Sequence, residues 1–178
     1  MRILIASDIH GSIKYARRVA ELMEIEKADR LLLLGDLYYH GPRNPLPEEY
    51  DPKEVANLFN SIKDKLMVVK GNCDAEVDEM ISDFNFEAEI RMKIGNKRFF
   101  FTHGHHINKD KLPEDTDVLV YGHFHTGFIE EVDGIICMNP GSTTLPKNDT
   151  PHSYGIIDDG LLQVKKLNGD VIFQKNIE

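Results

Sequence analysis

Six short apolar runs limit the fold of this chain more than any other feature of its sequence. They span residues 3–6, 31–34, 66–69, 99–101, 118–121 and 135–138, and each is bounded by Gly, Pro, Asn or Asp. Runs of about four apolar residues between turn residues are typical of buried strands, whereas helices need roughly ten residues or more. We therefore predict six buried strands.

Two stretches between these runs have the spacing of amphipathic helices. After the first run, Ser12 can cap a helix whose apolar residues at 13, 16, 19, 20 and 23 share one face. A second stripe, at 55, 56, 58, 59 and 62, begins near Pro52, and proline is favoured in the first turn of a helix. The chain therefore begins in the order strand, helix, strand, helix, strand.

The second half of the chain is richer in strands. Residues 86–94 and 99–102 are expected to pair as a hairpin around Gly95-Asn96. Residues 153–157, 161–167 and 171–177 are expected to form a meander. An α/β front and a β-rich back predict two sheets packed face to face with helices outside. The 178 residues fit a single domain over residues 1–178.

The charge balance limits the partners of the chain. Thirty acidic residues against 21 Lys and Arg give a formal net charge of −9. Wrapping of DNA or RNA and binding to an anionic membrane both need a cationic surface, so neither is expected. A phosphate ester is still compatible as a substrate, because a local cation can reverse the field inside a site.

The sequence also limits the compartment. The first apolar run is too short for a signal peptide, and no stretch approaches the roughly 20 apolar residues that a membrane span needs. Two cysteines, Cys73 and Cys137, are too few for a disulfide framework. We expect a cytoplasmic protein.

Five of the predicted strands are followed at once by side chains that can bind a metal ion. The segments are Asp8-Ile9-His10, Gly35-Asp36, Gly71-Asn72-Cys73-Asp74, His103-Gly104-His105 and Gly122-His123-Phe124-His125. Open α/β sheets place their sites at the ends of strands, and glycine lets the backbone approach a bound group. Turns and core histidines explain each motif alone, but they do not explain five similar strand ends. We therefore predict a metal site.

The predicted ligands are seven side chains: Asp8, His10, Asp36, Asn72, His103, His123 and His125. Seven are too many for one tetrahedral ion but suit two ions that share a bridge, for which the Asp36 carboxylate is the natural candidate. Oxygen and imidazole donors without a thiolate fit Mn, Fe, Zn, Co or Ni. Two divalent ions, two aspartates and a bridging hydroxide leave one positive charge, which would attract a phosphate ester.

These motifs, in this order, resemble the signature of the calcineurin-like metallophosphoesterases. The opening Met1-Arg2-Ile3, the Gly71-Asn72-Cys73-Asp74 segment, the His40-Gly41-Pro42-Arg43-Asn44 loop and Asn139-Pro140-Gly141-Ser142 are similar to the small bacterial YfcE-type phosphodiesterases. The resemblance implies a four-layer α/β/β/α sandwich and a two-metal centre usually studied with Mn²⁺. It also implies that a hydroxide bound at the two metals hydrolyses a phosphodiester by in-line attack.

Position by position, the resemblance implies one metal on Asp8, His10 and His125. It implies a second on Asn72, His103 and His123, with Asp36 on both. The larger family's phosphomonoesterases carry a proton-donating His where this chain has Cys73. A thiol is a poorer acid than imidazolium at neutral pH, so leaving groups that need little protonation should react best. Cys73 could equally be a small packing residue.

Two further residues are candidates with open alternatives. His105 could reach a phosphate oxygen, or it could orient a neighbouring ligand. Arg43, in a loop braced by prolines, suits a substrate phosphate, and a solvated arginine or an oligomer contact explains it as well. His40 could border the site, although a loop histidine is the simpler interpretation. The segment 139–142 is interpreted as a structural turn.

The sequence therefore predicts a metal-dependent phosphodiesterase that acts on a small phosphodiester. One alternative is a phosphomonoesterase or nucleotidase of the same fold. The other is a non-catalytic protein-binding scaffold of the type of a eukaryotic retromer subunit, which has lost part of the ligand set. The family resemblance also implies a homodimer or homotetramer.

Overall fold

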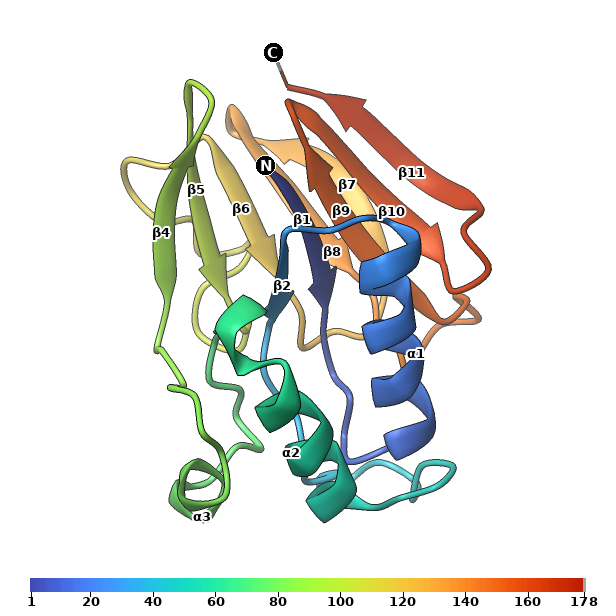
Figure 1. The fold of residues 1–178 in the computed structure, drawn as a ribbon. Helices are drawn as coiled ribbons and strands as arrows, with labels where there is room; N and C mark the ends of the chain where they lie inside the picture. Colours follow the sequence, from blue (N-terminus) through green and yellow to red (C-terminus); the bar gives the residue numbers. More distant parts are fainter. Residues whose placement is uncertain (178) are drawn as a thin grey trace.

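The computed structural model describes residues 1–177 and contains two mixed β-sheets packed face to face (Figure 1). The six-stranded sheet has the order β11-β10-β9-β1-β2-β3, and the five-stranded sheet has the order β4-β5-β6-β8-β7. The first consists of β1 (Arg2–Ala6), β2 (Arg30–Leu33), β3 (Leu66–Val68), β9 (Ser153–Asp158), β10 (Leu161–Lys166) and β11 (Val171–Asn176). The second consists of β4 (Ile90–Ile94), β5 (Lys97–Thr102), β6 (Val118–Tyr121), β7 (Gly127–Val132) and β8 (Ile135–Pro140).

Burial on both faces explains why the central strands are apolar without interruption. In β1, Ile3 and Ile5 pack against the other sheet, whereas Leu4 and Ala6 face the helices. In β5, Phe99 and Phe101 belong to the core between the sheets, and the Phe100 between them faces outward. Successive side chains of a strand point to opposite faces, so a strand inside a layered fold needs apolar residues at every position.

Helices α1 (Ile13–Ile25) and α2 (Pro52–Ser61) cover the outer face of the six-stranded sheet (Figure 1). The Ser12 hydroxyl accepts the Tyr15 N–H at 3.5 Å and caps α1, as predicted. The Asp51 carboxylate accepts the Glu54 N–H at 3.1 Å and caps α2, whose first residue is Pro52. A 3₁₀ helix η1 (Lys63–Lys65) and a short helix α3 (Glu76–Met80) follow.

The two sheets and the helices outside the first sheet confirm the predicted architecture. The fourth layer, on the outer face of the second sheet, is not helical in the part of the chain that the structure describes. Within residues 1–177, a loop rather than a helix covers the outer face of the five-stranded sheet. Ile107 and Leu112 of that loop pack against Phe100 and Leu119. The loop contains Gly104 and Pro113 and lacks the spacing of an amphipathic helix, which explains its irregular backbone.

Three local features differ from the sequence prediction. The first hairpin strand begins at Ile90 rather than at residue 86, because the backbone of Glu87 pairs with the end of β3. The Glu87 N–H donates to the Val68 carbonyl at 2.9 Å, and the Lys70 N–H donates to the Glu87 carbonyl at 2.8 Å. Strand β7 and helix α3 were not predicted. The C-terminal meander is confirmed, since β9, β10 and β11 pair in antiparallel order.

The parallel strands bring their carboxyl ends to one end of the molecule. β1 pairs in parallel with β2 and β2 with β3, while β5 pairs in parallel with β6. The arrows of β1, β2, β5 and β6 all point toward the lower end of the view in Figure 1, and the two termini lie at the upper end. The motifs that follow these strands are therefore collected on one side.

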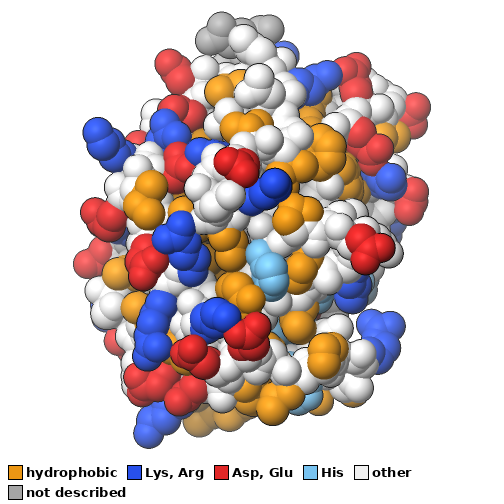
Figure 2. Space-filling view, turned by 90° about the vertical axis from the view of Figure 1, so that its right-hand side faces the viewer, with side chains coloured by type: hydrophobic (Ala, Val, Ile, Leu, Met, Phe, Trp, Pro, Cys, Tyr) orange, Lys and Arg blue, Asp and Glu red, His pale blue; other side chains and the backbone are white. Residues whose placement is uncertain are grey.

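The surface carries both signs of charge. On the face drawn in Figure 2, Lys and Arg side chains lie among Asp and Glu side chains. No helix formed by residues 1–177 is long and apolar enough to cross a membrane.

Candidate metal centre

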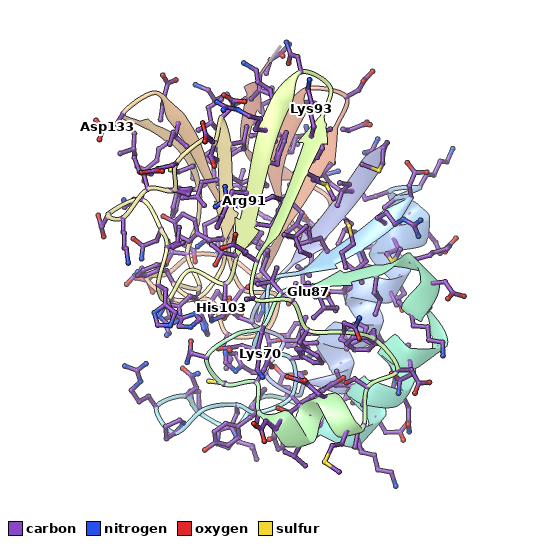
Figure 3. The ribbon with its side chains drawn as sticks, turned by 90° about the vertical axis from the view of Figure 1, so that its left-hand side faces the viewer. Lys70, Glu87, Arg91, Lys93, His103 and Asp133 are labelled. Carbon is purple, nitrogen blue, oxygen red and sulfur yellow. The ribbon has the colours of Figure 1, made fainter. Side chains whose placement is uncertain are left out.

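The structure brings together all seven predicted ligand residues at the carboxyl ends of five strands. Asp8 and His10 follow β1, Asp36 follows β2, Asn72 follows β3, His103 follows β5, and His123 and His125 follow β6. Figure 3 shows His103 at the lower ends of the strands beside a group of nitrogen-bearing side chains, whereas Lys93 on β4 lies at the opposite end. Both sheets therefore contribute donors to one centre.

The first group of donors consists of Asp8, His10 and His125. The Nε2 atoms of His10 and His125 lie 3.3 Å apart, and the Oδ1 atom of Asp8 lies 3.3 Å from His125 Nε2 and 3.8 Å from His10 Nε2. Asp8 is fully buried, and its Oδ1 atom has no hydrogen-bond partner among the described residues. A buried carboxylate oxygen without a partner is costly unless a cation completes its surroundings.

The second group gathers around His103. Its Nε2 atom lies 3.0 Å from Asn72 Oδ1, 3.2 Å from His123 Nδ1 and 3.5 Å from Asp36 Oδ2. The same Asp36 oxygen lies 3.7 Å from His10 Nε2 in the first group. Asp36 therefore stands between the two groups, as a bridging carboxylate would.

Backbone carbonyls fix the orientation of three of the histidines. The Nδ1 atoms of His10, His103 and His125 lie 2.8, 2.6 and 2.6 Å from the carbonyl oxygens of Tyr39, Leu34 and Leu145. A carbonyl oxygen can only accept, so each Nδ1 carries a proton, and in the neutral imidazole each Nε2 presents its lone pair to the centre. This is the arrangement that metal-binding histidines use in proteins.

Five of the seven residues have a left-handed backbone, which is uncommon outside glycine. The φ angles lie between 49° and 65° at Asp8, His10, Asp36, His123 and His125. Each such residue costs on the order of 1–3 kcal/mol and persists only where the surrounding structure holds it. Here the loops hold each other, since the His10 N–H donates to the Asp36 carbonyl at 2.8 Å. At these five positions the left-handed backbone turns the side chains inward.

Two glycines permit the loops to approach this closely. A Cβ atom on Gly71 would lie 2.1 Å from the Oδ1 atom of Asp36, and one on Gly122 would lie 1.9 Å from the Ser7 hydroxyl oxygen. Any larger residue at either position would displace a carboxylate or its neighbour. The glycines before Asn72 and His123 are therefore required by packing rather than by a turn conformation.

Asp74 holds two of the ligand loops together, a role that the sequence analysis missed. Its carboxylate accepts the backbone N–H groups of Asp36 at 2.8 Å, Leu37 at 2.8 Å and Gly71 at 2.7 Å. Burial and the charge of Asp36 raise the pKa of Asp74 to about 6. The place of Asp74 in the Gly71-Asn72-Cys73-Asp74 motif was the available signal, but its partners are distant in the sequence.

The segment after β8 supports the site from behind, and it includes Ser142 of the predicted turn 139–142. The Ser142 hydroxyl donates to the Asp8 carbonyl at 3.0 Å, and the Thr143 hydroxyl donates to the Ser7 carbonyl at 3.2 Å. Leu145 supplies the carbonyl that orients His125. The segment thus fixes both the loop of Asp8 and the ring of His125.

The electrostatics of the centre favour cations. Burial alone would raise the pKa of Asp8, but His125, His103 and His10 together outweigh burial and hold the pKa below its usual range. Burial disfavours protonation of His103, yet its hydrogen bond to Asp36 and the charges of Asp8 and Asp36 raise its pKa to about 9. In the absence of a metal, protons on histidines balance the two carboxylates. Divalent cations would take over that role.

The donor set fits metal ions in three overlapping groups. Ligand atoms lie within 4.8 Å of one another in Asp8, His10 and His125, in Asp8, Asp36 and His103, and in His10, Asp36 and Cys73. Oxygen and imidazole donors, oriented lone pairs and the unpartnered oxygen of Asp8 all suit divalent ions of the first transition row. The residues present therefore fit the group that the sequence predicted.

A cavity of about 460 Å³ opens next to this centre. Its lining includes Asp36, Asn72, His123 and His125 of the centre, together with Tyr39, Gly41, Pro42, Arg43, Asn44, Cys73 and Lys147. Arg43 and Cys73 thus face the same space as the predicted ligands. Lys147 and Tyr39 were not predicted, because neither belongs to a motif at a strand end.

Cys73 and His105 occupy different positions. The Cys73 N–H donates to Asp36 Oδ1 at 2.8 Å, and burial together with the charge of Asp36 raises the pKa of the thiol to about 12. His105 is absent from the described residues that line the cavity, and its ring packs on His106 with centroids 4.0 Å apart. Its centroid lies 5.4 Å from that of His103. His105 therefore lies beside a predicted ligand, and its two predicted roles stay predictions.

Comparison with known proteins agrees with this geometry. A family model described as the calcineurin-like phosphoesterase superfamily domain matches residues 1–159. The chain is 44% identical over 175 residues to phosphodiesterase YfcE of Escherichia coli (strain K12), with 97% of this chain and 95% of that protein covered. The solved structure of YfcE, described as a phosphoesterase from E. coli, matches with a TM-score of 0.97 at 41% identity and covers 100% of both chains.

A more distant structure shares the fold alone. Vacuolar protein sorting 29 from Cryptosporidium parvum matches with a TM-score of 0.66 at 18% identity, over 98% of this chain and 97% of that chain. The family model covers far more than half of the sequence, and the E. coli relative is matched over nearly its full length. The chain belongs to the calcineurin-like phosphoesterase superfamily.

Proposed function

We propose that this chain is a phosphodiesterase that depends on two divalent metal ions. The observation that carries the proposal is the gathering of donor atoms from five strand ends into two groups with Asp36 between them. The 44% identity to phosphodiesterase YfcE supports the reaction class. The protein-binding scaffold is not favoured, because likeness to vacuolar protein sorting 29 at 18% identity concerns the fold alone.

In this proposal Asp8, His10 and His125 hold one ion, and Asn72, His103 and His123 hold the other. Asp36 contributes to both, and Mn²⁺ is the first expectation, with Zn, Fe, Ni or Co as alternatives. When bound, divalent ions neutralise charge on the ester oxygens and make hydroxide available at neutral pH. The carbonyls of Tyr39, Leu34 and Leu145 keep the histidine lone pairs aimed at the ions.

The residues of the cavity wall position the substrate. Arg43 presents a guanidinium group that can donate two parallel hydrogen bonds to phosphate oxygens. Cys73 lies beside Asp36, and its raised pKa of about 12 keeps the thiol protonated, so it can donate a hydrogen bond but is a weak acid. The ring of His105 packs beside that of His103, whose orientation the Leu34 carbonyl fixes, so His105 supports this ligand by packing.

The weak acidity of Cys73 favours diesters of good leaving groups over monoesters. A phosphomonoesterase or nucleotidase needs a stronger proton donor for its alkoxide leaving groups. Rates on matched aryl monoesters and diesters separate the two functions. Cys73→His should shift the ratio toward monoesters, and an unchanged ratio would remove the thiol from the argument.

The direct test is hydrolysis of bis(p-nitrophenyl) phosphate. We expect activity with added Mn²⁺ and loss of activity on chelation. Metal analysis at saturating Mn²⁺ should give two ions per chain, whereas a scaffold could leave sites empty. The proposal is wrong if the metal-loaded protein cleaves neither phosphodiesters nor phosphomonoesters.

We further propose that the substrate is a small phosphodiester rather than a polynucleotide. The net charge of −9 and the mixture of charges on the face in Figure 2 support this view. A cytoplasmic location and a homodimer or homotetramer stay predictions, for which gel filtration and cell fractionation are the measurements.

A further inference from the structure

Two cationic side chains line the cavity from different loops and have no acidic partner. Arg43 lies in the loop after β2, and Lys147 lies in the loop after β8. Most Lys and Arg side chains of this acidic protein are ion-paired. Within residues 1–177, neither Arg43 nor Lys147 forms an ion pair, and Asp36 is the one carboxylate in the cavity lining. Both charges are therefore available to a ligand.

The backbone around Lys147 is fixed close to the metal centre. The Lys147 N–H donates to the carbonyl of His125 at 3.1 Å. The carbonyl of Lys147 accepts the N–H of Thr150 at 3.1 Å and its hydroxyl at 2.7 Å. The turn that follows has left-handed residues at Asn148 and Asp149, with φ of 55° and 58°. This turn is tied to a predicted ligand, so the backbone that carries the exposed Lys147 side chain is held at the cavity.

The loop of Arg43 is fixed on the other side. Gly41 has φ of 82°, and a Cβ atom at this position would lie 3.3 Å from the sulfur of Cys73. The Asn44 side chain donates to the His40 carbonyl at 2.8 Å and closes the loop on itself. Pro42 and Pro45 flank this segment and reduce its freedom. The backbone that carries the Arg43 side chain is therefore constrained beside the metal centre.

A simple phosphodiester does not use both of these cations. Two divalent ions against Asp8 and Asp36 leave two positive charges, which a hydroxide and the single negative charge of a diester together offset. The cavity volume of about 460 Å³ is that of a pocket for a ligand much larger than one phosphate. Two further cations at its wall match a second anionic group at some distance from the reacting phosphorus.

We propose that Arg43 and Lys147 form a subsite for a second anionic group, so that the preferred substrate is a phosphodiester with a terminal phosphate on one of its alcohols. A phosphate carries about −1.5 to −2 charge at neutral pH, which two cations balance. This inference rests on the proposed phosphodiesterase function and names the class of substrate for the same site.

The test compares two p-nitrophenyl diesters on the metal-loaded full chain, one with an ethyl arm and one with a 2-phosphonoethyl arm. We expect kcat/KM to be on the order of tenfold higher for the phosphonoethyl diester, since two charge-assisted contacts supply about that factor. In Lys147→Gln the ratio of the two kcat/KM values should fall toward one. The matched control is Lys93→Gln, an exposed lysine at the opposite end of the molecule (Figure 3), which should leave the ratio unchanged.

Binding gives a second readout that does not require turnover. Calorimetry should show that ethane-1,2-diphosphonate binds on the order of tenfold more tightly than ethylphosphonate, and that Lys147→Gln reduces this difference more than Lys93→Gln does. Hydrolysis of the ethyl diester without preference for the phosphonoethyl arm would overturn the subsite while leaving the proposed function intact. Equal preference for a carboxyethyl arm would overturn its specificity for phosphate. Failure to hydrolyse either diester would count against the function, and the binding comparison would still decide the subsite.

Discussion

Two buried clusters of charge in this molecule are built on opposite principles. Behind the six-stranded sheet, Glu26 accepts hydrogen bonds from Arg2 at 2.6 Å, from the Tyr154 hydroxyl at 2.6 Å and from Lys165. Arg2 also donates to Asp158 at 2.9 Å. At the carboxyl ends of the strands, Asp8 keeps one oxygen without a partner, and the Nε2 atoms of His10 and His125 face each other. Both oxygens of Glu26 have partners within the chain, whereas one oxygen of Asp8 has none among the described residues.

The difference separates a structural cluster from a functional one. The Glu26 cluster supplies its own cations, so nothing has to be added for both oxygens to be satisfied. In the candidate metal centre the backbone is left-handed at five of the predicted ligand residues, and the Nδ1 atoms of His103 and His125 face carbonyls so that their Nε2 atoms face a shared space. A fold retains such strain and such unpartnered groups where a bound ion completes them.

The largest effect is expected for Asp36→Asn. Loss of the shared carboxylate should lower diesterase activity with Mn²⁺ by more than about 100-fold, since even changes in the outer shell of a metal site cost 10–100-fold. Circular dichroism should show a retained fold, because the asparagine removes charge repulsion with Asp8 and Asp74. Glu26→Gln is the matched control, a buried carboxylate outside the centre that should keep its activity. Similar losses in both variants would contradict the distinction between the clusters.

Bound Mn²⁺ should stabilise the folded protein through the candidate metal centre and not through the Glu26 cluster. At about 100 times the dissociation constant of a site, Mn²⁺ should stabilise the fold by about 2.7 kcal/mol for each bound ion, or roughly 5–10 °C in Tm per ion for a chain of this size. Differential scanning calorimetry should show the share of one ion lost in Asp8→Asn and the whole shift retained in Glu26→Gln. An undiminished shift in Asp8→Asn would place the bound ion elsewhere.

Asp74→Asn tests a carboxylate whose two oxygens both accept hydrogen bonds, like those of Glu26, but which lies inside the candidate metal centre. The variant replaces one acceptor oxygen with an N–H₂ group that faces backbone donors, so unfolding free energy should fall by about 1–3 kcal/mol. Activity should also fall by about 10–100-fold, because the Asp36 and Asn72 loops lose their common anchor. Urea denaturation and kcat/KM measure the two effects. A stability loss without any activity loss would confine Asp74 to a structural role.

The smallest expected effect is the change with pH in the stability that the Glu26 cluster contributes. Burial opposes ionisation of Glu26, but its bonds from Lys165, Tyr154 and Arg2 lower its pKa below the ordinary value of 4.5. Its contribution is therefore fully present above about pH 4.5 and is lost as the pH falls through the lowered value. Urea midpoints of the wild type and of Glu26→Gln should converge as the pH falls below about 4.5. A constant difference over this range would show that the charge of Glu26 is not what stabilises the cluster.

The amino-acid sequence determined the two-sheet architecture and the chemistry of the centre. Continuous apolar runs require burial on both faces, and polar side chains directly after such runs must emerge where the strands end. Local order was therefore enough to predict Ser12 as a cap, the C-terminal meander and the seven candidate ligands. The metal roles of those seven stay a proposal, although the structure places them together.

Contacts between distant segments decided the rest. Glu87 pairs with the end of β3 rather than extending β4. Asp74 accepts N–H groups from a loop 37 residues away. The Lys147 N–H donates to the His125 carbonyl, which holds the loop of Lys147 beside the cavity. No local pattern encodes these partners, because each depends on which loops the two sheets bring side by side. The left-handed backbone of Asp8, His10 and Asp36 has the same origin, since neighbouring loops hold conformations that isolated segments would avoid.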